Sequence, residues 1–400
     1  MKTKNPFTLN LSVYAITVII SFFVMMKPLT ANAEKLDFNG DGKSDVFWRN
    51  SLTGETSAWL IDGKNVQYTQ YGTVPDSSGW EIWGAGDFNG DGNTDVFWYN
   101  YNTGATSAWL IDGGQVIQYT QYGTVPDSSG WYIVGFGDFN GDGNTDVFWY
   151  NLYTGATSAW LIDGGQVIQY TEYEAVSDDW SIKGFGDFNG DGNTDVFWYN
   201  YKTGATSAWL IDGGQVIQYT QYGTVPDSSF WEIWGVGDFN GDGNTDVFWY
   251  NYNTGATSAW LIDGGQVIQY TEYGTVPDSS GWRIAGFGDF NGDGNTDVFW
   301  YNLNTGKTSA WLIDGENVQY KEYGPTSQGS DWPDWIIADF GDFNGDGTTD
   351  VFWFNTYNGQ TLAWQFRKGL ISRYSLVKYS TALPSSGWYP VSFFVYYYLL

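Results

Sequence analysis

Short runs of β-branched and aromatic residues, separated by glycine-rich turns, recur along nearly the whole chain. One unit contains four such runs, at 131–137, 146–150, 157–162 and 166–173. The second is apolar at consecutive positions, as in a strand covered on both faces, whereas the fourth mixes polar and apolar residues, as in a strand near solvent. No helical period appears after residue 34. The pattern predicts an all-β unit of four strands.

This unit repeats along the sequence. Each copy carries a nine-residue loop of the form Asp-x-Asn-x-Asp-Gly-x-x-Asp, which starts at Asp37, Asp87, Asp138, Asp187, Asp238, Asp289 and Asp342. Successive loops are 49 to 53 residues apart. A fixed period of this length indicates a repeat architecture in which each unit packs against its neighbours. Seven four-stranded units predict a seven-bladed β-propeller over residues 34–400.

The two ends of the sequence predict how the ring closes. Only Glu34–Leu36 precede the first loop, which is too little for a strand, whereas the last run, at 388–394, has no loop after it. We therefore expect the tail to supply the missing strand of the first blade. Pro390 cannot donate to a ladder, but it is tolerated on an edge strand.

The N-terminus has the pattern of a targeting segment. Lys2 and Lys4 precede an apolar run at 11–26, and Ala31–Ala33 fits an A-x-A cleavage site. Residues 1–33 are therefore predicted to be a signal peptide, and the mature chain to be extracellular, periplasmic or at the cell surface, with no membrane span. The alternative is an uncleaved anchor, for which the run is short.

The net charge of the chain indicates which classes of partner it can bind. The formal net charge is −29, from 45 acidic and 16 basic residues, and the seven loops account for 21 of the acidic residues. Such a surface repels nucleic acid. Much of the acidity is explained by the loops, so the sequence does not indicate an acidic tail. It does not indicate the oligomeric state.

The loop has the oxygen donors of a calcium site. In the copy at 138–146, side-chain oxygens stand at positions 1, 3, 5 and 9, position 7 offers a backbone carbonyl, and Gly143 permits a sharp turn. The chain has no His and no Cys, which argues against zinc and copper. Position 12 is Trp in every copy, where an EF-hand needs an acid, so the loop is expected to join two strands. The alternative is a set of Asx turns without metal.

Seven intact copies favour Ca²⁺, up to seven ions. The expected ligands are Asp37, Asn39, Asp41, Lys43, Asp45, Asp87, Asn89, Asp91, Asn93, Asp95, Asp138, Asn140, Asp142, Asn144, Asp146, Asp187, Asn189, Asp191, Asn193, Asp195, Asp238, Asn240, Asp242, Asn244, Asp246, Asp289, Asn291, Asp293, Asn295, Asp297, Asp342, Asn344, Asp346, Thr348 and Asp350.

These motifs resemble a known family. The run from Trp131 through Asp138 to Trp149 is similar to the FG-GAP or VCBS repeat, and the resemblance covers about residues 37–400. It implies the seven-bladed propeller of integrin α-subunit heads and of many exported bacterial proteins, with a calcium hairpin between the first two strands of each blade. A similar architecture occurs in a calcium-containing fungal lectin that binds N-acetylglucosamine. The further domains of an integrin do not appear in this sequence.

The connection between blades is the candidate ligand site. It reads Gly-Thr-Val-Pro-Asp-Ser-Ser-Gly-Trp, and its Asp and Ser can bond sugar hydroxyls while the Trp packs on a pyranose ring. The alternative is a turn whose Asp and Ser bond only local backbone. The candidate residues are Asp76, Trp80, Asp127, Trp131, Asp227, Trp231, Asp278 and Trp282. The repeated Trp149 and Trp160 are expected to serve blade-to-blade packing.

The repeats, the loops and the connections between blades together predict a function. The leading hypothesis is a multivalent, lectin-like binding module that recognises glycans, and the alternative is an adhesion platform for an extracellular protein. We expect the protein not to be an enzyme, because the chain lacks His for a Ser-His-Asp triad and its patterned Asp residues repeat sevenfold. A polysaccharide-acting enzyme with a carboxylate pair is the third hypothesis.

Overall fold

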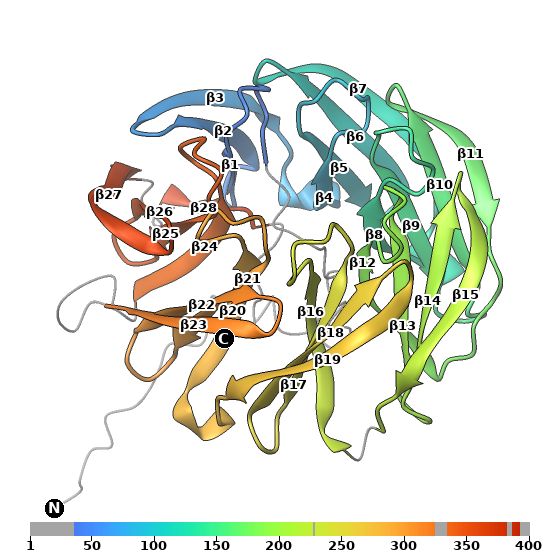
Figure 1. The fold of residues 1–400 in the computed structure, drawn as a ribbon. Helices are drawn as coiled ribbons and strands as arrows, with labels where there is room; N and C mark the ends of the chain where they lie inside the picture. The colour runs from blue at the N-terminus through green and yellow to red at the C-terminus, as the bar shows by residue number, and fades with distance from the viewer. Residues whose placement is uncertain (1–35, 227–228, 325–333, 382–385, 393–400) are drawn as a thin grey trace, which may run out of the picture.

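Seven four-stranded antiparallel sheets are arranged around a central axis (Figure 1). The structure is a computed structural model that describes residues 36–226, 229–324, 334–381 and 386–392. The predicted signal peptide and the last eight residues lie outside this range. The all-β seven-bladed propeller predicted from the repeat is confirmed.

The blades follow one another along the chain, and in blades 2 to 7 the innermost strand comes first, whereas blade 1 takes its innermost strand from the end of the chain. Blade 1 contains β28 (Trp388–Pro390), β1 (Val46–Asn50), β2 (Glu55–Asp62) and β3 (Asn65–Thr73). Blade 2 contains β4 (Trp80–Gly86), β5 (Asp95–Asn100), β6 (Ala105–Asp112) and β7 (Gln115–Thr124). Blade 3 contains β8 (Trp131–Gly137), β9 (Asp146–Asn151), β10 (Thr157–Asp163) and β11 (Gln166–Glu172). Blade 4 contains β12 (Trp180–Gly186), β13 (Asp195–Asn200), β14 (Ala205–Asp212) and β15 (Gln215–Thr224).

The remaining three blades have the same order. Blade 5 contains β16 (Trp231–Gly237), β17 (Asp246–Asn251), β18 (Ala256–Asp263) and β19 (Gln266–Thr275). Blade 6 contains β20 (Trp282–Gly288), β21 (Asp297–Asn302), β22 (Thr308–Asp314) and β23 (Asn317–Tyr323). Blade 7 contains β24 (Trp335–Gly341), β25 (Asp350–Asn355), β26 (Gln360–Arg367) and β27 (Leu370–Thr381). Three-residue 3₁₀ turns, η1 (Asp76–Ser78), η2 (Asp127–Ser129) and η4 (Asp278–Ser280), precede β4, β8 and β20.

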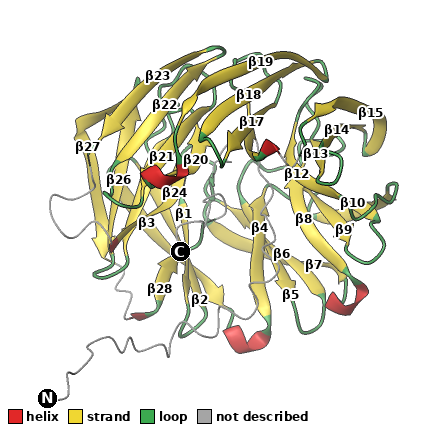
Figure 2. Cartoon of the chain, turned by 90° about the horizontal axis from the view of Figure 1, so that it is seen from below, coloured by secondary structure: helices red, strands yellow, loops and turns green. Residues whose placement is uncertain are grey.

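Helical structure is confined to short turns in the described residues (Figure 2). None of the helices in that part of the chain has the length and apolar character needed to cross a membrane.

Both ends of the chain build the first blade. β28 pairs antiparallel with β1, with Trp388 opposite Asn50 and Pro390 opposite Trp48. Val391 N–H donates to the carbonyl oxygen of Phe47 at 2.8 Å, which extends the seam beyond Pro390. The predicted closure is therefore confirmed, and Pro390 is accommodated because the innermost strand of a blade is an edge.

The core lies between neighbouring blades. Phe148, Ala159 and Leu161 of blade 3 pack against Trp198 and Trp209 of blade 4, and each blade interface repeats this arrangement. The second strand of a blade is buried on both faces because a neighbouring blade covers each of them. Consecutive apolar residues at these positions are the sequence signal of that environment.

The outer strands are largely exposed. Most residues of β7 are exposed to solvent, and Ile117 and Tyr119 are 58% and 62% exposed. The mixed polar and apolar pattern of this run therefore reflects an edge strand at the rim of the ring.

Candidate functional site

The loops before each second strand are folded around their first Asp. In the copy at 138–146, Asp138 Oδ1 accepts the backbone N–H of Gly141 at 2.7 Å, and Oδ2 accepts that of Gly143 at 2.8 Å. Asp142 Oδ1 accepts both the backbone N–H and the side-chain amide of Asn144, at 2.8 and 2.9 Å. The carboxylates at positions 1 and 5 thus hold the turn in shape.

The last Asp of the loop has a second, structural role. Asp146 is fully buried; its Oδ2 accepts the N–H of Phe139 at 3.0 Å, and its Oδ1 accepts the N–H of Ile162 at 2.7 Å. It therefore ties the loop to β10. Burial raises the pKa of Asp146 to about 8, because the charged form is desolvated. The sequence analysis assigned this residue to metal binding alone and missed the clamp.

The donor set of the loop is that of a hard cation. The side-chain donors at positions 1, 3, 5 and 9 are oxygens. The Oδ1 atom of Asn144 is buried without a hydrogen-bond partner among the described residues, and it lies against Gly90 of the preceding loop. The same holds for Asn93 and Asn193 in neighbouring copies. In the described part of the chain, no group of three or more His, Cys, Asp or Glu is arranged to hold a metal ion. The donor types of the loop are those that calcium prefers, whereas its carboxylates are engaged with backbone N–H groups and are not gathered around one point.

The seven loops are joined into a closed belt. Thr194 N–H, in the loop of blade 4, donates to the carbonyl oxygen of Asp138 in the loop of blade 3 at 2.6 Å. Equivalent bonds link every pair of successive loops, and Ser44 N–H closes the ring by donating to Asp342 at 2.7 Å. A Cβ on Gly137 would lie 2.6 Å from Thr194 Cγ2, so glycine suits this close approach. Blade 1 has Leu36 at the equivalent position and still forms the bond from Thr94 N–H to the carbonyl oxygen of Asp37 at 2.7 Å. Neither the belt nor its glycine was anticipated from the sequence.

A second set of bonds strengthens the belt. Gly214 N–H, in the Asp-Gly-Gly turn of blade 4, donates to the carbonyl oxygen of Phe139 at 2.8 Å. The loops and these turns therefore share one face of the ring. The connections lie at the other face, where Val125 N–H donates to Gly104 at 2.7 Å.

The predicted ligand residues of the connection are dispersed by the structure. Asp76 pairs with the Arg49 guanidinium at 2.7 Å, and Asp278 pairs with that of Arg283 at 2.9 Å. Asp127 opens η2, and Asp227 lies outside the described residues. The tryptophans begin innermost strands and are half-buried, and one of them, Trp131, lines a pocket.

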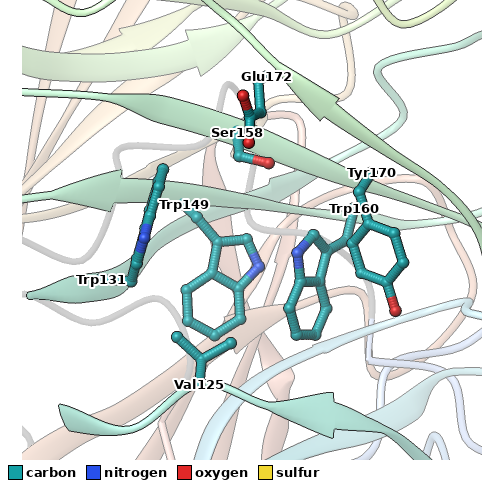
Figure 3. A pocket seen from close by; sticks show the side chains of 7 residues that line it. All are labelled: Val125, Trp131, Trp149, Ser158, Trp160, Tyr170 and Glu172. Carbon is teal, nitrogen blue, oxygen red and sulfur yellow. The ribbon is translucent and has the colours of Figure 1, made fainter. Parts of the chain in front are cut away.

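That pocket has a volume of about 350 Å³ and lies between blades 2 and 3. It is lined by Val125, Trp131, Trp149, Ser158, Trp160, Tyr170 and Glu172. In Figure 3 the Trp149 ring stands between those of Trp131 and Trp160, with its nitrogen turned toward Trp160, and Ser158 and Glu172 stand beside the rings. Trp149 and Trp160 pack with ring centroids 4.7 Å apart.

The floor of the pocket holds an unused donor. Trp149 is 1% exposed, and its Nε1–H has no hydrogen-bond partner among the described residues. The equivalent nitrogen is likewise buried and unpartnered in Trp48, Trp98, Trp198, Trp249, Trp300 and Trp353, so this feature belongs to the repeated Trp pair of every blade. The sequence analysis read Trp149 and Trp160 as packing residues, and they do pack, but the same rings form the pocket.

Strand register repeats this arrangement around the ring. Trp149 faces Ser158 across β9 and β10, and Ser158 faces Glu172 across β10 and β11, so the three side chains form one row. The corresponding rows are Trp48–Ser57–Gln70, Trp98–Ser107–Gln121, Trp198–Ser207–Gln221, Trp249–Ser258–Glu272 and Trp300–Ser309–Glu322. In blade 7 the row is Trp353–Leu362–Lys378, so the hydroxyl is lost.

The sequence was compared with models of known protein families, and one family matches. The FG-GAP-like repeat matches residues 37–98, 87–149, 187–249, 238–300 and 289–353, which together span more than half of the chain. The chain belongs to the FG-GAP-like repeat family. Comparison of the FG-GAP-like propeller with curated proteins gives no match.

Solved structures with a similar fold are distant in sequence. A structure from an analysis of two prolyl endopeptidases has a TM-score of 0.53 at 8% identity, covering 87% of this chain and 51% of that one. An oligogalacturonate lyase in complex with manganese has a TM-score of 0.47 at 11% identity, covering 84% and 83%. A provisionally named 6-phosphogluconolactonase from Bacteroides uniformis has a TM-score of 0.49 at 13% identity, covering 88% and 100%. These likenesses concern the fold alone.

One prediction is corrected by this comparison. The expectation that the protein is not an enzyme is wrong as a deduction from its architecture, because a structure of a prolyl endopeptidase shares the propeller fold. The FG-GAP-like propeller does indicate a binding module.

Proposed function

We propose that the protein is an exported, calcium-stabilised propeller that binds carbohydrate in the pockets between its blades. The observation that carries the proposal is a pocket of about 350 Å³ that combines the rings of three tryptophans with a hydroxyl and a carboxylate. Sites for small ligands typically combine apolar and aromatic walls with a few placed polar groups.

A sugar ring matches both properties of this pocket. The rings of Trp131, Trp149 and Trp160 offer apolar faces for the C–H side of a pyranose, while Trp149 Nε1–H donates to a hydroxyl. Ser158 and Glu172, in register with Trp149, add a donor and acceptors on the same side. A purely apolar ligand would leave these polar groups unpaired, which disfavours it.

Repetition would make binding multivalent. Six blades carry the Trp–Ser row in the same register, so a branched or repeating glycan can engage several pockets at once. Weak single sites would then give useful avidity.

Calcium is proposed as the stabiliser of the loops. In the copy at 138–146, Asp138, Asn140, Asp142 and Asp146 with the carbonyl of Asn144 would hold it, and the ion would supply the positive charge that this acidic loop lacks. Binding would draw the carboxylates at positions 1 and 5 away from backbone N–H groups. The belt bonds of the loop use backbone carbonyls and are independent of these carboxylates.

A second function is favoured by the outer strands. Ile117, Ile168, Ile217 and Ile268 are each 58% exposed on consecutive blades, beside exposed tyrosines. Apolar residues repeated on an exposed surface are typical of protein-binding sites. An adhesion platform for an extracellular protein is therefore the alternative, and it uses the rim instead of the pockets.

A glycan array separates the two functions. The mature chain is applied in millimolar Ca²⁺ and again in EDTA, and its melting is followed in both. Sugar binding by wild type, with one site fewer in Trp149→Phe, supports the pocket. Ile168→Thr, an exposed change on the same blade, is the matched control and should bind like wild type. No signal from the folded, calcium-loaded protein would reject the carbohydrate proposal and leave the rim as the binding surface.

A further inference from the structure

The outer strands of three blades differ at one residue only. β7 and β15 have the same sequence, and β19 differs from them by Glu272 in place of a Gln. This residue faces Ser258, so it belongs to the row that lines the pocket. The other nine positions of β19 are unchanged, so a difference in strand stability or packing does not account for the substitution.

The third residue of each row, on the outer strand of the blade, is charged in some blades and neutral in others. It is Gln in blades 1, 2 and 4, and Glu in blades 3, 5 and 6. In blade 6 the carboxylate of Glu322 lies 4.0 Å from Lys307 Nζ, which offsets its charge. Glu172 and Glu272 have no ion pair among the described residues. When the pocket at Glu172 is extended to the other rows by their shared register, the pockets of Glu172 and Glu272 are acidic and those of Gln121 and Gln221 are neutral.

Resting on the proposed carbohydrate function, we propose that the acidic pockets bind a sugar that carries an ammonium group, whereas the neutral pockets bind uncharged sugars. A cation is attracted to the faces of indole and phenol rings, and Trp149, Trp160 and Tyr170 line the pocket of Glu172. A carboxylate beside those rings adds a charge-assisted hydrogen bond, which is stronger than the neutral bond that a Gln amide makes.

The position of the carboxylate sets the size of the effect. Glu172 ends β11 on the exposed side of the row, and Trp149 lies at its buried end. An ammonium group would therefore sit at the mouth of the pocket with the sugar ring on the indoles. Water and salt screen a charge at such a place, so we expect a moderate preference that weakens as salt is added.

The chain supplies its own matched variants. Glu172→Gln with Glu272→Gln converts the acidic pockets into copies of the neutral ones, and Gln121→Glu with Gln221→Glu does the reverse. All four side chains keep nearly the same size and lie at the edge of a blade, so the variants should melt as wild type does. Circular dichroism and melting curves check this before binding is measured.

The probes are the β-1,4-linked tetramer of glucosamine and its fully N-acetylated counterpart, titrated calorimetrically at pH 6 in 50 mM and 300 mM salt. The Gln variant should lose about threefold to tenfold in affinity for the glucosamine tetramer relative to its affinity for the acetylated one. The Glu variant should gain by a similar factor at low salt and less at high salt.

The outcomes separate this inference from the function on which it rests. Equal binding of the glucosamine tetramer by wild type and both variants, with the sugars still bound, overturns the charge classes and leaves carbohydrate binding intact. Failure of wild type to bind either tetramer or any array glycan rejects the proposed function, and this inference with it.

Discussion

The loop belt and the pocket rows occupy the same blades, but they vary very differently. Every loop contributes the same buried Asp, such as Asp146, and the same inter-blade hydrogen bonds, including the pair at the seam between blades 7 and 1. The pocket rows instead change at their exposed end from Gln to Glu, and blade 7 loses the Ser.

The difference separates the part of each blade that stabilises the ring from the part that contacts a ligand. A ring closes only if each blade presents the same backbone geometry to the next, so the hydrogen bonds of the belt are kept even where blade 1 has Leu36 and Ser44 in place of the Gly and Thr of other blades. A pocket can change at its mouth without disturbing the ring, because Glu172 lies on an edge strand whose outer side faces solvent. The loop face should therefore govern stability, and the pockets should govern recognition.

Removal of calcium should have the largest effect. Extracellular calcium modules often bind with Kd of about 10⁻⁴–10⁻³ M, so at tenfold excess each of the proposed sites would add about 1.4 kcal/mol. Together they would contribute about 10 kcal/mol, and EDTA should lower the melting temperature by roughly 10 °C. Differential scanning calorimetry measures this. Sugar binding below the melting temperature should persist in EDTA, and an unchanged melt would show that the loops hold their shape without an ion.

Loss of the closing strand should come next. Deleting residues 386–400 removes β28 and opens the first blade at β1. At about 1 kcal/mol for each lost backbone hydrogen bond, we expect a loss of roughly 5 kcal/mol in unfolding free energy. Urea unfolding provides the measurement, with a deletion of only 393–400 as control. Equal stability of the two deletions would mean that β28 does not latch the ring.

Within one loop, two acidic residues should behave differently. Asp146→Ala leaves the N–H groups of Phe139 and Ile162 buried and unpaired, at a cost of about 2–4 kcal/mol with or without calcium. Asp142→Ala removes hydrogen bonds that are exposed or partly buried, so its cost should be larger in calcium and smaller than that of Asp146→Ala in EDTA. Melts of both variants in both buffers give the comparison. Similar losses in EDTA would contradict the clamp assigned to Asp146.

The smallest effect on stability should come from the pocket. Ser158→Leu copies the residue that blade 7 has at Leu362, and we expect it to change stability by less than about 1 kcal/mol. It should nevertheless remove the pocket between blades 2 and 3 from the binding stoichiometry. Calorimetric titration with an array-positive glycan counts the sites. An unchanged number of sites would place binding elsewhere on the ring.

Much of the fold follows from the sequence, and less of the site does. The 50-residue period, the four runs per unit and the unmatched run at 388–394 predict seven blades and their closure, because these are local patterns repeated at a regular interval. The candidate residues of the connection were less informative. Asp76 and Asp278 are paired with arginines, and only Trp131 lines the described pocket.

By itself, the sequence determined the kind of each strand, the number of blades and the oxygen-only donors of the loops. The tertiary structure decided which side chains meet. Trp149, Ser158 and Glu172 become one row only through strand register, and Thr194 reaches Asp138 only when two blades lie side by side. The physical reason is distance along the chain: strand and turn preferences act over a few residues, whereas the pocket and the belt join residues that packing alone brings together.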